Sequence, residues 1–124
     1  MTPAELLAEA RSLISRPDAS MAGVWPRTAA FLTRQALEDA VDARWAASSA
    51  TAPMLQASMW SRLACLSAYV TGSEARQATF AYAALSRACH YHPYELAPTA
   101  AELSSWINDV AKLITILTAS HVSP

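Results

Sequence analysis

The segment TAAELSSWINDVAKLITIL, residues 99–117, carries the clearest helical pattern in the chain. Its apolar residues recur every three or four positions, which is the spacing of one face of an α-helix. Thr99 and Glu102 have the spacing of a capping box, in which the two residues satisfy each other's backbone N–H groups at a helix start. The segment predicts a long amphipathic helix with an apolar face formed by Leu103, Trp106, Ile107, Val110, Leu113, Ile114 and Leu117.

Earlier segments repeat this helical spacing. We expect helices at residues 3–15, 26–45, 53–70 and 73–91, with Gly72 as a left-handed cap that closes the third. The last of them should end near Tyr91, because the residue before Pro93 avoids helical geometry. The short connections favour up-and-down packing. The sequence therefore predicts an all-α fold, an antiparallel bundle of four to five helices, with residues 1–120 as one domain and 121–124 as a loose tail.

Composition limits the functions that the chain can perform. The formal net charge of −1 excludes a protein that coats nucleic acid through bulk electrostatics, because that mode of binding needs a clear basic excess. All nine basic residues except Lys112 are arginine, which grips phosphate and carboxylate through two parallel hydrogen bonds. A GC-rich bacterial genome would produce the same excess without any functional demand, so the arginine content alone indicates nothing.

The sequence also gives expectations about compartment and surface. The first fifteen residues carry Glu5 and Glu9 and lack the features of a secretory signal, and no run is long and apolar enough to span a membrane, so we expect a cytoplasmic protein. Cys65 and Cys89 should be reduced and packed as small apolar residues. On the helix at 26–45 we expect a solvated face formed by Arg34, Glu38 and Asp42.

The candidate chemistry lies in the segment RACHYHPY, residues 87–94. Arg87 should lie in the last turn of its helix, and His92 at the exit. Arginine offers forked donors for phosphate oxygens, and histidine gives and takes protons near neutral pH. An arginine and a histidine are the smallest set of side chains that could cleave a phosphodiester without a metal ion. The segment predicts that chemistry with no cofactor.

These residues resemble the HEPN family of small helical domains, whose signature is an arginine, four to six residues, and a histidine. Arg87 and His92 match with four residues between them, and Tyr94 matches a tyrosine that toxin members paired with nucleotidyltransferases often carry. Residues 36–40 resemble an early helix of the family, so the likeness spans about residues 26–117. After the arginine, where the family usually has Asn, Asp or His, this chain has Ala88.

The resemblance implies a metal-independent endoribonuclease, a toxin or defence component that acts as a homodimer. Arg87 and His92 would be catalytic, and His90 and Tyr91 would support them or bind substrate RNA. Tyr94 would be the site at which a nucleotidyltransferase antitoxin attaches AMP. With Ala88 in place of the polar residue, the alternative is a non-catalytic HEPN-like module that binds RNA or another protein.

Other interpretations of the same residues remain open. Arg87 could cap its helix through the last carbonyls, and Cys89, His90 and His92 could bind a metal, although their spacing makes no closed site. The aromatic residues Tyr91 and Tyr94 could close the end of the bundle. The chain could also be an unrelated helical bundle. We assign the four tryptophans to packing: Trp25, Trp45, Trp60 and Trp106.

Overall fold

A computed structural model describes residues 1–15, 24–91 and 96–119, and 81% of these described residues are helical. The described residues form five α-helices, two short 3-10 helices and no strand, which confirms the predicted all-α fold. The elements in chain order are α1 (Pro3–Ser15), α2 (Trp25–Ala46), η2 (Ala52–Gln56), α3 (Met59–Ala64), η3 (Cys65–Ala68), α4 (Gly72–Cys89) and α5 (Ala100–Thr118).

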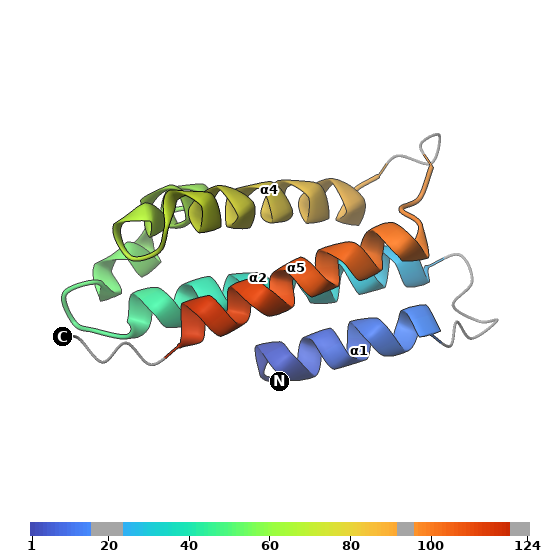
Figure 1. Cartoon of the computed structure of the whole chain (residues 1–124), viewed down its shortest axis with the longest axis horizontal. Coiled ribbons are helices and arrows are strands. Elements are labelled where there is room, and N and C mark those ends of the chain that lie inside the picture. The colour runs from blue at the N-terminus through green and yellow to red at the C-terminus, as the bar shows by residue number, and fades with distance from the viewer. Residues whose placement is uncertain (16–23, 92–95, 120–124) are drawn as a thin grey trace.

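The four long helices run alternately up and down the bundle, as the short connections predicted (Figure 1). Helices α2 and α5 therefore run in the same direction and pack side by side. Helix α1 packs against both of them, and α4 packs mainly against α2. The start of α2, the end of α4 and the start of α5 consequently meet at one end of the bundle.

Alanines and leucines form most of the core. The small alanine side chains let the helices approach closely. Along α2, Ala29, Ala30, Ala36 and Ala40 are fully buried, so small side chains face the neighbouring helices. The larger side chains fill the remaining space, and burying one leucine stabilises the fold by about 1.5–3 kcal/mol. The largest fully buried apolar side chains are Leu37, Leu63, Leu66, Leu85, Leu103, Ile107, Leu113, Val41 and Val110.

Three of the long helices begin with the same device, a threonine and glutamate that cap each other. The predicted pair at the start of α5, Thr99 and Glu102, forms this capping box. An equivalent box opens α4, where the hydroxyl of Thr71 accepts the N–H of Glu74. At the start of α1, Thr2 and Glu5 exchange the same two hydrogen bonds.

The expectation for Gly72 was wrong. Gly72 is the first residue of α4, and no described glycine has a positive φ. Thr71, in extended geometry with ψ of 154°, caps α4. A threonine hydroxyl that accepts a backbone hydrogen bond satisfies a donor at the helix start, so a glycine turn is not needed to separate the helices.

The single helix expected at residues 53–70 is replaced by three short elements, η2, α3 and η3. The break lies at Ala57 and Ser58, whose ψ angles of 164° and 158° are extended. Ser58 starts α3 anew because its hydroxyl accepts the N–H of Ser61, at 3.2 Å. Leu63 and Leu66 still reach the core, so the apolar spacing identified the buried residues but not the continuity of the helix.

The face of α2 expected to be solvated is partly covered. Helix α3 packs beside α2, and Arg62 donates to Asp42 at 2.6 Å with its side chain only 18% exposed. Arg34 and Glu38 form an ion pair at 3.4 Å and are also partly buried. Charged residues at fourfold spacing thus line a contact between helices here, and the prediction of a solvent-facing stripe was wrong.

Two packing expectations also need correction. Trp45 is buried, and Trp25 and Trp106 are partly buried, but Trp60 is half exposed with its ring edge-on to Tyr82 at 4.9 Å. Cys65 is exposed and Cys89 buried, and both are free thiols. Both exposed residues lie in the connection between α2 and α4, where the short helices leave one face uncovered.

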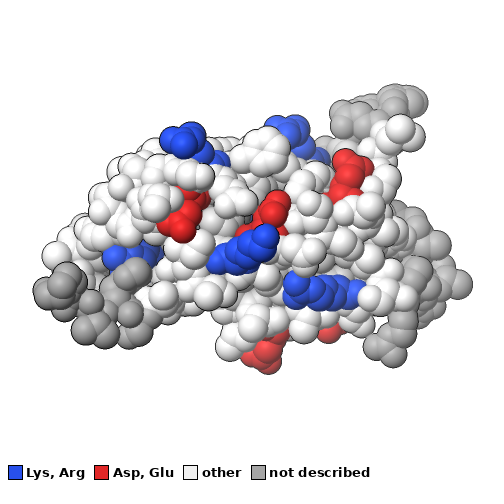
Figure 2. All heavy atoms as spheres, viewed as in Figure 1, with Lys and Arg blue, Asp and Glu red and all other residues white. Residues whose placement is uncertain are grey.

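The described surface carries mixed charge. Basic and acidic side chains alternate over the face shown in Figure 2 and do not gather into one patch. None of the described helices combines the length and apolar character needed to cross a membrane. Residues 121–124, expected to be a loose tail, lie outside the described residues.

Candidate functional site

Arg87 lies in the last turn of α4, as the sequence predicted. The helix ends at Cys89, because His90 leaves helical geometry with φ of −125° and its N–H bonds back to the carbonyl of Arg87 at 3.1 Å. The side chain of Arg87 is exposed, and no salt bridge joins it to another described residue. Its guanidinium is therefore free of a competing carboxylate within the described part of the chain.

A groove of about 580 Å³ lies beside Arg87, between the end of α4 and the start of α5. Arg87 supplies positive charge to the groove, and the rings of Tyr91 and Trp106 supply flat surfaces. The carboxylate of Glu102 accepts a hydrogen bond in the cap of α5. Proteins bind single-stranded nucleic acids with this combination, because aromatic rings stack on the bases and a cation contacts the phosphates. The groove is lined by Ala84, Arg87, Ala88, Tyr91, Leu96, Ala97, Pro98, Thr99, Glu102 and Trp106.

A second, smaller pocket of about 270 Å³ lies between α2 and the end of α4. His90 lines this pocket and not the groove. The structure therefore separates His90 from Tyr91, although the sequence predicted both as supporting residues of one site. Arg27 of α2 supplies positive charge to it, whereas the charge of Arg34 is paired with Glu38 at 3.4 Å. The lining residues are Arg27, Thr28, Phe31, Arg34, Cys89 and His90.

Arg27 connects the two cavities. Its guanidinium stacks on the ring of Tyr91 at 4.6 Å, and its Nη2 donates to the Tyr91 carbonyl at 3.0 Å. These contacts fix Tyr91, which lines the groove, to the start of α2. Cation–π stacking of this kind contributes about 0.5–1 kcal/mol at an exposed site.

Arg27 was not among the predicted site residues, and Arg34 was predicted only on a solvated face. A signal for both existed, because Arg27, Phe31 and Arg34 are spaced three and four residues apart and therefore share one face of α2. That spacing alone would not have shown that this face meets the end of α4. Only the packing of α2 against α4 brings Arg27 to Tyr91.

Neither the cysteine in the pocket nor the residue after Arg87 offers catalytic chemistry. Burial raises the pKa of the Cys89 thiol, so it stays protonated near neutral pH and is a poor nucleophile. Ala88 is 5% exposed and faces the core. The position where the HEPN family usually has a polar residue therefore supplies no polar group to the groove.

Two predicted site residues, His92 and Tyr94, lie outside the described residues. His92 follows Tyr91 directly in sequence, and Tyr94 comes two residues after His92. Across residues 1–15, 24–91 and 96–119, no three His, Cys, Asp or Glu side chains gather in a way that could hold a metal ion. The alternative site formed by Cys89, His90 and His92 includes a residue beyond those ranges.

The structure thus places three arginines, Arg27, Arg34 and Arg87, with His90 and Tyr91 around the end of α4. This arrangement can bind an anion from two sides of one helix end. Comparison with protein-family models, with curated proteins and with solved structures finds no match to this chain.

Proposed function

We propose that this protein is an HEPN-like ribonuclease that binds RNA at the end of α4 and cleaves it without a metal ion. The observation that carries the proposal is the setting of Arg87: an exposed guanidinium, unpaired among the described residues, in a groove with Tyr91 and Trp106. A phosphate of RNA fits the charge, and an unpaired base fits the rings. The all-α fold is compatible with the resemblance.

The chemistry requires two proton-transfer groups, and a homodimer would supply them. One His92 takes the proton of the ribose 2′-hydroxyl as its oxygen attacks the adjacent phosphorus. The bond from phosphorus to the 5′-oxygen breaks, and the partner subunit's His92 donates a proton to that leaving oxygen. Arg87 stabilises the negative charge that develops on the phosphate oxygens. The products are a cyclic phosphate and a free 5′-hydroxyl, so the step needs no co-reactant.

The resemblance adds a mode of regulation to this proposal. Tyr94 follows His92 by two residues, so AMP attached to its phenol by a partner nucleotidyltransferase would bring bulk and negative charge next to the groove. RNA phosphate would then be repelled from the same place. A toxin or defence component held inactive in this way would act in the cytoplasm.

Ala88 favours a second candidate, an HEPN-like module that binds RNA or a protein without cleaving. Its buried methyl group leaves Arg87 without a polar neighbour at the position where the family usually has one. Large aromatic side chains are also exposed on the same molecule, at Phe31, Trp60 and Phe80. Aromatic side chains are enriched where proteins bind one another.

Cleavage of a fluorescent single-stranded RNA in excess EDTA tests both candidates. Wild type is compared with Arg87→Ala and His92→Ala, and Arg76→Ala is the matched control, because Arg76 is another exposed arginine on α4 that does not line the groove. Removing the general acid–base should lower the rate by about 10²–10⁴. Binding that depends on Arg87 without cleavage would select the second candidate in its RNA-binding form. Folded wild type that neither cleaves nor binds RNA would refute the ribonuclease and the RNA-binding module, and would leave only a module that binds a protein.

A further inference from the structure

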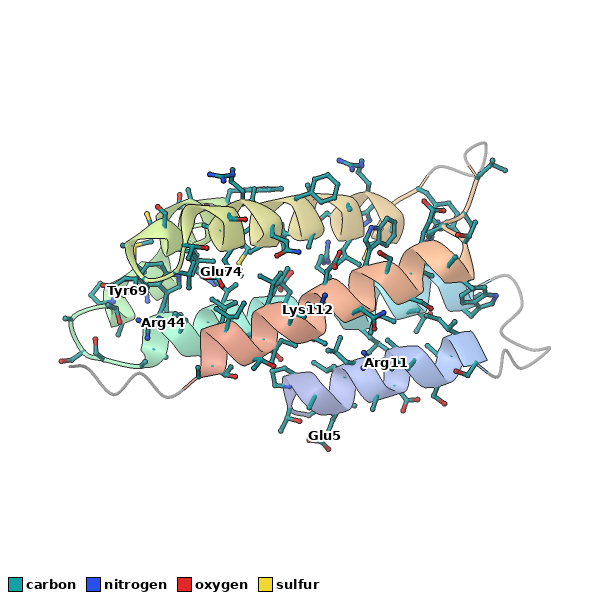
Figure 3. All side chains as sticks on the ribbon, viewed as in Figure 1. Glu5, Arg11, Arg44, Tyr69, Glu74 and Lys112 are labelled. Carbon is teal, nitrogen blue, oxygen red and sulfur yellow. The ribbon has the colours of Figure 1, made fainter. Side chains whose placement is uncertain are left out.

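A separate cleft of about 550 Å³ lies at the end of the bundle opposite Arg87, where α2 and α5 end. Its volume lies within the range of about 300–1,000 Å³ that small-molecule sites occupy. Arg44 and Tyr69 are labelled side by side at this end in Figure 3. Small side chains form most of the remaining wall, notably Ala43, Ala47, Ala50, Ser48, Thr51 and Thr118.

Arg44 is held in a fixed position within this cleft. Its guanidinium lies 4.6 Å from the centre of the Tyr69 ring. The Tyr69 ring meets the buried Trp45 edge to face, at 5.4 Å and 85°. Trp45 is fixed in turn, because its Nε1 donates to the carbonyl of Arg62 at 3.2 Å. A guanidinium stacked on a rigid ring keeps its planar edge of N–H donors available to a ligand.

The Nε of Arg44 is buried and has no hydrogen-bond partner among the described residues. No salt bridge joins Arg44 to another described residue. The nearest acid in sequence, Asp42, is paired with Arg62 at 2.6 Å. A buried donor without an acceptor is unfavourable, most of all on a charged group. The Arg44 guanidinium therefore has no counter-charge among the described residues.

A purely structural role accounts for only part of this arrangement. Arg44 lies in the last turn of α2, where a cation compensates the negative end of the helix. That role explains the charge, but it needs neither the stacking on Tyr69 nor a cleft beside an unpaired Nε. The same helix ends limit what can bind, because the carbonyls at the ends of α2 and α5 oppose a strongly negative ligand.

We propose that the Arg44 cleft binds a small organic carboxylate with a flat, apolar body. One carboxylate matches the single guanidinium through two parallel hydrogen bonds. Among the described residues that line the cleft, Arg44 alone is charged, so a monoanion is balanced there and a phosphate dianion is not. The flat body lies among the alanines, because the hydroxyls of Ser48 and Thr118 are already bonded to Thr51 and to the Ile114 carbonyl. This site is independent of the RNA site proposed at the other end of the bundle.

Benzoate is a suitable probe, with benzamide as its neutral counterpart of the same shape. We expect titration of the isotope-labelled full chain to shift the NMR signals of Arg44 Nε–H and the Trp45 indole. Binding should saturate with a Kd on the order of 1 mM for so small a molecule. Benzamide and inorganic phosphate should each bind at least 10-fold more weakly. Equal binding of benzamide, tighter binding of phosphate, or no saturable shift would overturn the proposal.

Variants locate the binding. Arg44→Gln should weaken benzoate at least 10-fold, whereas Arg76→Gln, on an exposed arginine of α4, should leave it unchanged. Tyr69→Phe keeps the ring under the guanidinium and should retain binding. Because Arg44→Gln could disturb the end of α2, Ala47→Leu is a second variant that keeps Arg44 and fills the cleft, and it should also abolish binding. Full benzoate binding by a folded Ala47→Leu protein would contradict this site.

Discussion

Replacing Thr99 by alanine removes the side-chain half of the capping box that starts α5. In the folded protein the Thr99 hydroxyl accepts the N–H of Glu102 at 3.1 Å, and the Glu102 carboxylate accepts the N–H of Thr99 at 3.0 Å. Thr99 is exposed, so the substitution sacrifices little buried area. Its effect on stability therefore comes from the lost cap, which costs about 1 kcal/mol.

This cost converts into a measurable change in melting temperature. The entropy of unfolding is about 2.1 cal/mol/K per residue, which gives about 0.26 kcal/mol/K for a chain of 124 residues. A loss of about 1 kcal/mol should therefore lower the Tm by about 4 °C. Thr99→Ser keeps a hydroxyl at the cap, so its Tm should remain within about 1 °C of wild type.

Thermal unfolding followed by circular dichroism measures both variants, and urea denaturation gives the free energy directly. The double variant Thr99→Ala/Glu102→Ala should cost less than the sum of the two single variants, because each single change already breaks the shared box. A Thr99→Ala protein as stable as wild type would refute the capping argument. So would a Thr99→Ser protein that loses as much stability as Thr99→Ala.

Three other predictions follow from burial and charge. Leu113→Ala, at a site 1% exposed, should destabilise the protein by about 2–5 kcal/mol in urea denaturation, whereas Lys112→Ala on the exposed face should stay within about 0.5 kcal/mol of wild type. Iodoacetamide at pH 8 should modify the exposed Cys65 and should not modify Cys89 until urea is added, because Cys89 is buried and burial raises its pKa. Peptide mass spectrometry would measure both reactions, and modification of Cys89 in the folded protein would contradict its burial. The backbone N–H of Thr2, and then its hydroxyl, hold the pKa of Glu5 below its ordinary value, so the box at α1 stabilises the fold above the unfolded pKa and is lost in acid below about pH 4. Glu5→Gln should flatten this part of the stability–pH curve, and an unchanged curve contradicts the assignment.

Much of the fold follows from local sequence signals. The bounds of α1, α2, α4 and α5 agree with the predicted helices because apolar spacing and the Thr99 cap act within a few residues. The prediction of one continuous third helix was wrong, because the spacing of apolar residues does not show where a side chain caps a new helix start. Ser58 offered its hydroxyl to the N–H of Ser61, and this local bond outweighed helix continuity.

The candidate site was less predictable because it depends on contacts between distant segments. The sequence placed Arg87 in the last turn of α4, and the structure agrees. It gave no sign that Arg27, sixty-four residues before Tyr91, would bind the Tyr91 carbonyl. The stacking of Arg44 on Tyr69 is likewise a product of packing, since Arg44 lies on α2 and Tyr69 follows η3.

An NMR titration with a short single-stranded RNA locates any contact between nucleic acid and this protein. A 2′-O-methyl oligonucleotide is suitable, because the proposed chemistry needs a free 2′-hydroxyl and cannot cleave it. We expect saturable shifts at Arg87, Tyr91 and Glu102, which Arg87→Ala weakens and Arg76→Ala does not. The absence of saturable shifts at the end of α4, or shifts confined to the Arg44 cleft, would contradict an RNA site at Arg87.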